Sequence, residues 1–159
     1  PAIQTHRVET AQQMYEAAQS RFEAAQLTIL CAAVADYRPR TVAERKLKKQ
    51  AAALELRLEK TVDIAATLGQ QKRADQLLVG FALETNNEAE NARGKLERKN
   101  LDFIVLNSLR DPGAGFQHDT NKVSLLFRDN NRLDFELKTK TAVAVDIVDQ
   151  AVRILSTHR

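Results

Sequence analysis

The stretch ILCAAVADYRPRTVAERKLKK, residues 29–49, carries the features that predict the fold and the site of this chain. It begins inside an apolar run, residues 27–33, which we interpret as a parallel strand buried on both faces. The run ends before Asp36, and six basic side chains then follow against one acid, Glu44: Arg38, Arg40, Arg45, Lys46, Lys48 and Lys49. Ligands bind beyond the carboxyl ends of strands in open α/β sheets. The stretch therefore predicts a site for an anionic ligand, although a strand followed by a solvated, charged loop has the same pattern.

Composition predicts one soluble globular domain. The 159 residues are 43% hydrophobic and 28% charged, which is the balance of such domains. No apolar run approaches the roughly 20 residues of a membrane span, and the first residues do not resemble a secretory signal. We expect a cytoplasmic protein without a membrane partner.

Charge and metal-ligating residues narrow the possible ligands. The formal net charge is +3, and the basic surplus falls in residues 38–49 and 93–99. Two local basic patches favour a small polyanion over nucleic acid. The single Cys31 lies inside the apolar run and is interpreted as a core residue. The three histidines have no metal-ligand spacing.

Hydrophobic periodicity predicts an α/β fold with a parallel sheet. Continuous apolar runs predict buried strands, and amphipathic stretches predict helices between them. The expected strands are residues 3–8, 27–33, 77–82 and 103–106, and the expected helices are residues 11–25, 64–72, 87–99 and 141–155. Thr10, Asp63 and Asn87 are the predicted N-caps. In the last helix, the side chains expected to face inward are Val145, Val148, Val152 and Leu155.

Two further segments alternate apolar and polar side chains with a period of two. Residues 54–58 form one, and residues 122–138 form the other, as a hairpin around Asp129-Asn130-Asn131. Neither fits the parallel pattern, so we expect an antiparallel appendage. Exposed alternating strands form dimer contacts, and we expect a homodimer through these segments.

Phosphate binding in this chain must depend on side chains. There are only five glycines, and no GxGxxG or GxxxxGK[ST] motif is present. Lys95 and Lys99 lie four residues apart and therefore on one helix face. They are candidates for phosphate contacts, although surface ion pairs are the commoner role of such lysines. The Asp36 carboxylate is suited to bind a ribose hydroxyl or a metal ion, but it is equally suited to cap a turn. The Phe81 ring is suited to pack on a nucleobase, but its residue type favours a place in the hydrophobic core.

Four motifs resemble the phosphopantothenate–cysteine ligase family, the C-terminal half of a bacterial bifunctional coenzyme A biosynthesis flavoprotein. They are AAVADYRP, KLKK, GFALETNN and ARGKLERKNLDFIVLN, in this order. The resemblance covers roughly residues 1–155 and implies a dimeric, Rossmann-like αβα domain. It implies that CTP and Mg²⁺ activate phosphopantothenate as an acyl-cytidylate, which cysteine then attacks. It also implies a flavin-dependent decarboxylase as a fused or associated partner, with no flavin in this chain.

The resemblance also assigns roles to individual residues. Lys46, the first lysine of KLKK, matches the catalytic lysine of a flap, and residues 38–50 are expected to close over bound substrates. Asp36 matches the position on the cation side of the nucleotide and is the candidate metal ligand. The candidate nucleotide-binding residues are Ala32, Ala33, Asp36, Ile64, Phe81, Lys95 and Lys99.

The chain departs from the family pattern at two places. Residues 60–64 read KTVDI where the family usually has KNPDI, which affects the wall of the nucleobase pocket. The family's first segment, with the first Rossmann strand, a Gly-rich turn and an Asn that binds the acyl intermediate, would precede residue 1. We therefore expect residues 1–159 to be a partial ligase domain. The alternative is a fragment that binds nucleotide or dimerises without turnover.

Overall fold

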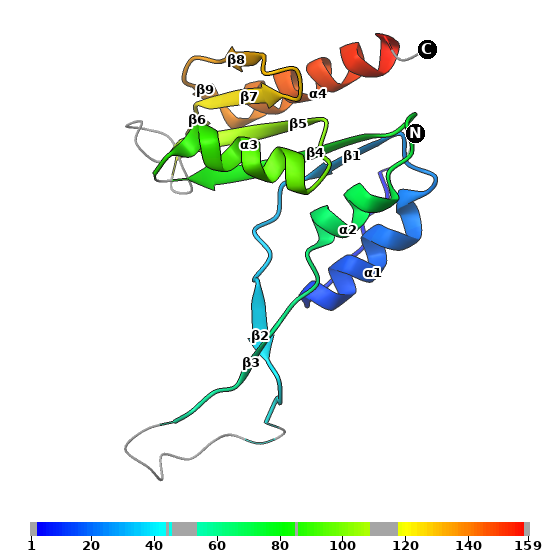
Figure 1. Ribbon diagram of the computed structural model, residues 1–159, viewed down its shortest axis with the longest axis vertical. Coiled ribbons are helices and arrows are strands. Elements are labelled where there is room, and N and C mark those ends of the chain that lie inside the picture. The colour runs from blue at the N-terminus through cyan, green and yellow to red at the C-terminus, as the bar shows by residue number, and fades with distance from the viewer. Residues whose placement is uncertain (1–2, 44, 46–53, 85, 109–117, 158–159) are drawn as a thin grey trace.

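The computed structural model describes residues 3–43, 45, 54–84, 86–108 and 118–157. Its centre is a five-stranded sheet in the order β1-β4-β5-β7-β8 (Figure 1). Three strands are parallel: β1 (Leu27–Leu30), β4 (Leu77–Glu84) and β5 (Phe103–Ser108). The hairpin strands β7 (Val123–Phe127) and β8 (Arg132–Asp134) continue the sheet in antiparallel orientation. The predicted Rossmann-like α/β class is confirmed, and the hairpin forms an edge of the main sheet rather than a separate unit.

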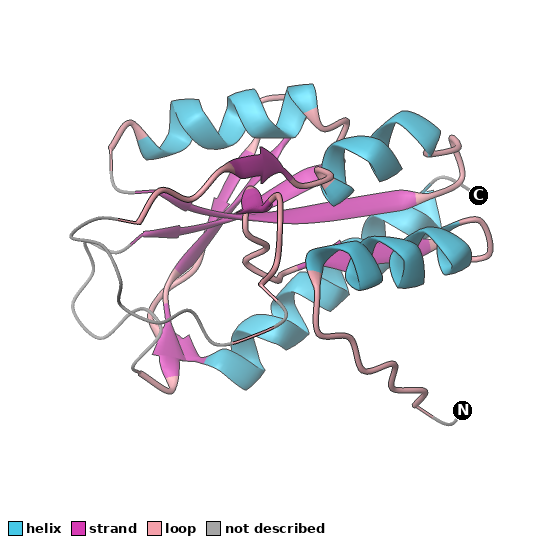
Figure 2. Ribbon diagram, turned by 90° about the horizontal axis from the view of Figure 1, so that it is seen from below, coloured by secondary structure: helices cyan, strands magenta, loops and turns pink. Residues whose placement is uncertain are grey.

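Helices cover both faces of this sheet (Figure 2). One core cluster joins the sheet to α1 (Ala11–Phe22), α2 (Ile64–Gln71) and α3 (Glu88–Arg98). A second cluster joins the opposite face to α4 (Lys140–Thr157). β4 and β5 contribute side chains to both clusters, as their continuous apolar sequences predict.

The three predicted N-cap residues all stand at the starts of helices, and two of them cap the helix with their side chains. The Thr10 hydroxyl accepts a hydrogen bond from Gln13 N, and the Gln13 side chain accepts one from Thr10 N. The Asp63 carboxylate accepts a hydrogen bond from Ala66 N at 3.1 Å. Asn87 is the N-cap residue of α3, as predicted, but it has φ 45° and its side chain makes no cap hydrogen bond.

An antiparallel arm stands apart from the main sheet. It pairs β2 (Tyr37–Pro39) with β3 (Leu58–Lys60), and Figure 1 shows it extending from the body. The predicted strand at residues 54–58 is thus displaced to residues 58–60. A second small pair joins β6 (Thr120–Asn121) to β9 (Lys138–Thr139).

The first strand of the sheet differs from its prediction. β1 ends at Leu30 and pairs only with β4 among the described strands. It is therefore an edge strand, and its residues are half-buried. Cys31 lies beyond its end and is exposed, so its assignment to the core was wrong. Residues 3–8 contain no strand, because no described strand lies beside them to supply hydrogen bonds.

The predicted buried face of α4 was also wrong. The helix buries Val143, Ile147 and Ala151, whereas Val145, Val148 and Val152 are exposed. Both sets repeat at helical spacing, so periodicity alone did not separate them. Of the predicted inward residues, only Leu155 packs against the core cluster.

Candidate functional site

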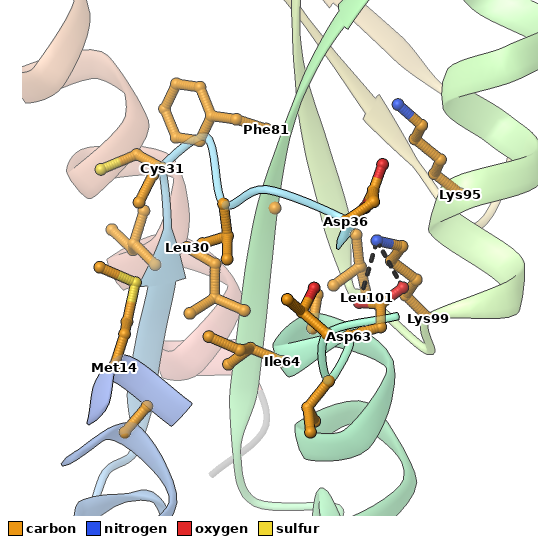
Figure 3. Close-up of a pocket in the computed structure, with 18 of the residues that line it drawn as sticks. Met14, Leu30, Cys31, Asp36, Asp63, Ile64, Phe81, Lys95, Lys99 and Leu101 are labelled. Atoms are coloured by element: carbon orange, nitrogen blue, oxygen red, sulfur yellow. Dashed lines mark hydrogen bonds and ion pairs between the residues drawn. The ribbon is translucent and has the colours of Figure 1, made fainter. Parts of the chain in front are cut away.

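A cavity of about 290 Å³ opens where β1 ends, on the sheet face that carries α1, α2 and α3. Its apolar side is built from α1, β1 and β4, with Met14, Leu30 and Phe81 among the lining residues. Its polar side carries Asp36, Asp63, Lys95 and Lys99, which Figure 3 shows grouped together. The cavity therefore combines an apolar wall with a charged rim.

Close packing beneath the cavity depends on Gly80 in β4. A Cβ atom at this position would lie 2.6 Å from Leu101 Cδ1, which is too close for two carbon atoms. Leu101 is buried and lines the cavity together with Gly80. The glycine thus allows the segment after α3 to lie against the sheet.

Lys99 is held by the residue that caps α2. Its Nζ lies 2.9 Å from Asp63 Oδ2 and donates a hydrogen bond to Asp63 Oδ1 at 3.0 Å. Partial burial acts to raise the pKa of Asp63, but hydrogen bonds from Lys99 and from Ala66 N together lower it below the ordinary value. The Asp63 side chain is 50% exposed, so water reaches this ion pair.

Lys95 is paired with the last residue of β4. Its Nζ lies 2.7 Å from Glu84 Oε1, and the Glu84 side chain is only 13% exposed. The Oε1 atom accepts no hydrogen bond from the described residues, so its contact with Lys95 is an ion pair. The other carboxylate oxygen is 3.4 Å from Asn91 Nδ2.

Asp36 differs from the other charged residues of the cavity in the contacts of its side chain. Its carboxylate makes no hydrogen bond or ion pair with any residue that the structure describes. Its backbone oxygen accepts from Thr61 N at 2.9 Å, and the Thr61 hydroxyl donates to Ala35 O at 2.5 Å. These bonds tie the segment after β1 to the segment before α2, and Asp36 lines the cavity on the same side as Lys95 and Lys99 (Figure 3).

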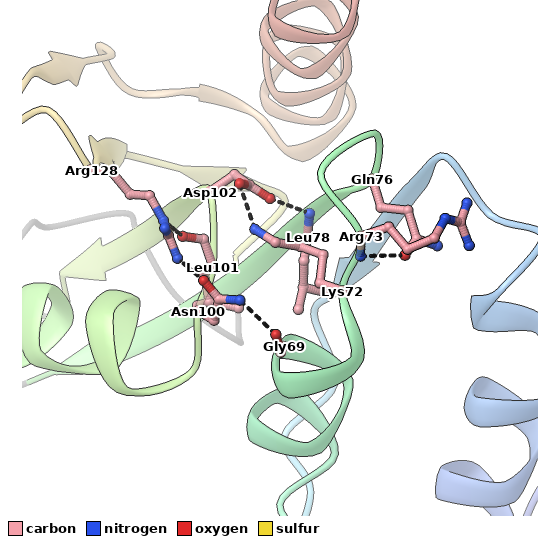
Figure 4. A network of polar contacts seen from close by, with 9 residues as sticks. All are labelled: Gly69, Lys72, Arg73, Gln76, Leu78, Asn100, Leu101, Asp102 and Arg128. Atoms are coloured by element: carbon pink, nitrogen blue, oxygen red, sulfur yellow. Dashed lines mark hydrogen bonds and ion pairs between the residues drawn. The ribbon is translucent and has the colours of Figure 1, made fainter. Parts of the chain in front are cut away.

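A network behind the cavity fixes the turn that follows α3 (Figure 4). Asp102 Oδ2 accepts from Leu78 N at 2.7 Å, and Oδ1 lies 2.6 Å from Lys72 Nζ. The Lys72 side chain is only 8% exposed. Asn100 Nδ2 donates to Gly69 O at 2.6 Å, which joins the α3 turn to α2. The end of α3, next to Lys99, and α2, which begins after Asp63, are therefore fixed against each other.

Most of the candidate residues lie in this cavity. Its lining includes Ala32, Asp36, Ile64, Phe81, Lys95 and Lys99. Ala33 is exposed and is not part of the lining. Phe81 is half-buried and lines the cavity, and it also packs against the second core cluster, as its residue type predicts. Lys46 lies outside the described residues.

Sequence reasoning missed the two carboxylates that hold the lysines. The sequence predicts Asp63 only as a helix cap and gives no partner for either lysine. Glu84 follows the predicted strand 77–82, at the end of the strand where ligands bind. Its place in the motif GFALETNN was the available signal.

This architecture is a Rossmann-like α/β domain with two lysines at the edge of a cavity. The chain belongs to the family described as the DNA/pantothenate metabolism flavoprotein C-terminal domain, whose model matches residues 1–155. The resemblance inferred from the motifs is thereby confirmed.

Individual relatives agree with the family assignment. The chain is 43% identical over 143 residues to the coenzyme A biosynthesis bifunctional protein CoaBC of Bacillus subtilis, covering 90% of this chain and 35% of the relative. It is 40% identical to the crystal structure of the C-terminal domain of CoaBC, with a TM-score of 0.77 and coverage of 97% of this chain and 69% of that one.

A third relative has a different name. A protein from an unknown prokaryotic organism, named cysteine/cysteine sulfinic acid decarboxylase, is 49% identical over 148 residues, which cover 93% of this chain and 41% of that protein. The chain thus spans only about two fifths of the curated relatives it matches. Within the described residues, no helix has the length and apolar character required to cross a membrane.

Proposed function

We propose that this chain is part of a ligase that joins phosphopantothenate to cysteine in coenzyme A biosynthesis, with CTP as the activating nucleotide. The observation that carries the proposal is the meeting of Lys95, Lys99 and Asp36 in one cavity with Phe81. Cationic side chains suit a triphosphate, and an aromatic side chain suits a base. The relatives named for coenzyme A biosynthesis support the same reaction.

The proposed reaction has two steps. The phosphopantothenate carboxylate attacks the α-phosphorus of CTP, forming the acyl-cytidylate and releasing pyrophosphate. The cysteine amine then attacks the acyl carbon, forming the amide and releasing CMP. Lys95 and Lys99 bind the phosphates, and Ile64, Phe81 and Ala32 border the nucleoside. Ala33 is retained as a backbone contact from the resemblance alone.

Lys46 is proposed to stabilise the negative charge that develops during acyl transfer. The resemblance places it on the flap, and the described part of that flap includes β2, next to Asp36. A contact formed mainly in the transition state raises turnover more than nucleotide affinity.

The cavity fits a Mg²⁺ ion that is bound together with the nucleotide. Mg²⁺ is commonly held by one or two carboxylates and by substrate phosphates, and Asp36 supplies a carboxylate without a described partner. No group of three or more His, Cys, Asp or Glu side chains that could hold a metal occurs within the described residues. Asp36 would therefore hold the ion with the phosphates, where the ion supplies charge neutralisation.

We further propose a homodimer formed through the β2–β3 arm. Leu58 and Tyr37 of this arm are 57% and 53% exposed, and Leu54 and Leu56 in the segment that leads into β3 are 68% and 60% exposed. An exposed apolar group of this kind marks a contact surface, and a second copy of the arm is the proposed occupant. Figure 1 places β8 far from the arm, so we assign the dimer to the arm rather than to the hairpin.

The remaining partners are proposed from the relatives. A bifunctional relative, of which the match covers 35%, supports fusion to a flavin-dependent decarboxylase located outside this chain. The proposed setting of the reaction is the cytoplasm. We assign the decarboxylase activity named for one relative to the part of that protein which this chain does not match.

Calorimetric titration with CTP and Mg²⁺ tests the proposal, followed by turnover with phosphopantothenate and cysteine. A charge-assisted contact contributes on the order of 1.5–3 kcal/mol, so Lys99→Ala and Lys95→Ala should each weaken CTP binding by roughly tenfold or more. CTP affinity unchanged in both variants and in the double variant would remove these lysines from the site.

The alternative is a nucleotide-binding fragment without turnover. It is favoured by the coverage of only 69% of the crystallised CoaBC domain and by the half-buried edge strand β1. CTP binding without product formation by residues 1–159, together with turnover by the longer protein, would support this alternative.

A further inference from the structure

The two lysines of the cavity are held in unequal ways. Lys99 pairs with Asp63, whose side chain is 50% exposed, whereas Lys95 pairs with Glu84, whose side chain is 13% exposed. Both lysines are themselves partly exposed, at 28% and 36%. The difference between the two pairs lies in the environment of the carboxylate.

Separating Lys99 from Asp63 leaves a carboxylate that water can solvate. Exposed ion pairs contribute little free energy, because water solvates both charges. Asp63 also keeps its hydrogen bond from Ala66 N, because that bond does not depend on Lys99. An incoming phosphate can therefore replace Asp63 as the partner of Lys99 at little cost.

Separating Lys95 from Glu84 removes the counter-charge of a carboxylate whose side chain is only 13% exposed. With Lys95 in place, Glu84 Oε1 is inaccessible to water, and it accepts no hydrogen bond within the described residues. The Asn91 amide reaches only the other oxygen, at 3.4 Å. Leaving a largely buried carboxylate without its counter-charge costs more than leaving an exposed one. Lys95 therefore remains with Glu84 when an anion arrives, and its other N–H groups are available to that anion.

We propose that polyphosphate binds this cavity by exchange at Lys99 and by addition at Lys95. Phosphate displaces Asp63 from Lys99, while Glu84 stays on Lys95 and acts as a positioning residue that fixes its ammonium group. The inference rests on the proposed function in that the anion is the triphosphate of a nucleotide.

The two carboxylates then have opposite effects on affinity. Asp63 competes with phosphate for Lys99, so removing its charge favours binding. Glu84 also repels phosphate through its charge, but it limits the positions that the Lys95 side chain samples, and this ordering is the larger effect in the proposal. If electrostatic repulsion alone acted, removing the charge of either carboxylate would change the affinity for phosphate in the same direction.

Matched carboxylate-to-amide substitutions test the inference in the full chain. Asp63→Asn keeps an oxygen for the Ala66 N–H, since Asn is also a good N-cap, and should tighten binding of inorganic tripolyphosphate and of Mg²⁺–CTP by about two- to fivefold. Glu84→Gln keeps the size of the side chain and should weaken binding of both probes by about three- to tenfold. A change of the same sign in the two variants would overturn the inference.

A double-mutant comparison separates positioning from a general loss of structure. In the presence of Lys95→Ala, Glu84→Gln should cause no further weakening, because there is no ammonium group left to position. If Glu84→Gln weakens binding equally with and without Lys95, Glu84 has a structural role and the inference fails.

The two probes distinguish failure of this inference from failure of the proposed function. If the two variants change the affinity for tripolyphosphate in opposite directions but CTP does not bind, the inference is supported and CTP is rejected as the ligand. If the chain binds and turns over CTP but both variants change the affinity in the same direction, the ligase is supported and the inference is rejected. If neither probe binds to the parent chain, both are rejected.

Discussion

Replacing Gly69 by alanine tests the packing that places Asp63 opposite Lys99. A Cβ atom at Gly69 would lie 1.9 Å from Lys99 O, and ordinary contact begins at 3.4 Å. The obstacle is backbone, so α2 or the α3 turn must move by roughly 1.5 Å to accept a methyl group, as expected for overpacking. The hydrogen bond from Asn100 Nδ2 to Gly69 O, 2.6 Å long, lies at the same contact and is lost with this movement.

Overpacking, the lost hydrogen bond and helix propensity together set the expected destabilisation. Overpacking of a well-filled site costs about 1–3 kcal/mol, and the lost hydrogen bond costs about 1 kcal/mol. Alanine regains about 1 kcal/mol of helix propensity relative to glycine. We expect a net loss of about 1–3 kcal/mol in the free energy of unfolding, and a fall in Tm of roughly 3–10 °C. The affinity for CTP should fall as well, because α2 carries Asp63 and Ile64 to the cavity.

Gly94→Ala is the matched control, measured by urea and thermal unfolding. Gly94 also lies within a helix, but its Cβ atom would meet only the guanidinium of Arg98, at 2.8 Å. Arg98 is exposed, so it can move away, and the helix should gain about 1 kcal/mol. The reasoning is refuted if Gly69→Ala is as stable as the parent chain, or if both variants change stability in the same direction.

Three further predictions concern the flap, the pH dependence and the dimer. In the longer protein, Lys46→Gln should lose most turnover while binding CTP nearly as well as the parent, and Lys48→Gln should have a milder effect; steady-state kinetics and calorimetry check both. The folded-state pKa of Asp63 is lowered below 3.8, so its stabilising contribution is present above that value and is lost as the pH falls through the folded-state pKa. When the pH falls from 6 to 3, the free energy of unfolding, measured with urea, should therefore decrease less for Asp63→Asn than for the parent. Leu56→Asp, at an exposed position in the segment that leads into β3, should convert a dimer into a folded monomer in analytical ultracentrifugation, and a parent chain that is already monomeric at tens of micromolar would contradict the proposed dimer.

The continuous apolar sequences determined the centre of the sheet. Residues 77–82 and 103–106 are apolar at every position that a two-sided core needs, and both are central strands. Helical spacing likewise placed Lys95 and Lys99 on one face of α3, and both reach the same cavity. Local chemistry was sufficient for Thr10 and Asp63, because a cap bonds to backbone groups only two or three residues away.

Only the tertiary structure decided which apolar faces are buried and which charges meet. The residues 27–33 are as apolar as the central strands, but β1 lies at the edge of the described sheet, and Cys31 beyond its end is exposed. In α4, two apolar stripes repeat at the same spacing, and the position of the helix over the sheet selected Val143 and Ile147.

The partners of the two lysines depend on contacts that no local pattern encodes. Asp63 meets Lys99 across 36 positions of sequence, because Gly69 allows α2 to approach the turn after α3. Glu84 meets Lys95 because β4 ends beside α3. The sequence by itself determined which side chains could bind a phosphate. The folded arrangement decided which carboxylate holds each lysine and how far water reaches that carboxylate, because ion-pair strength depends on burial and distance rather than on residue type.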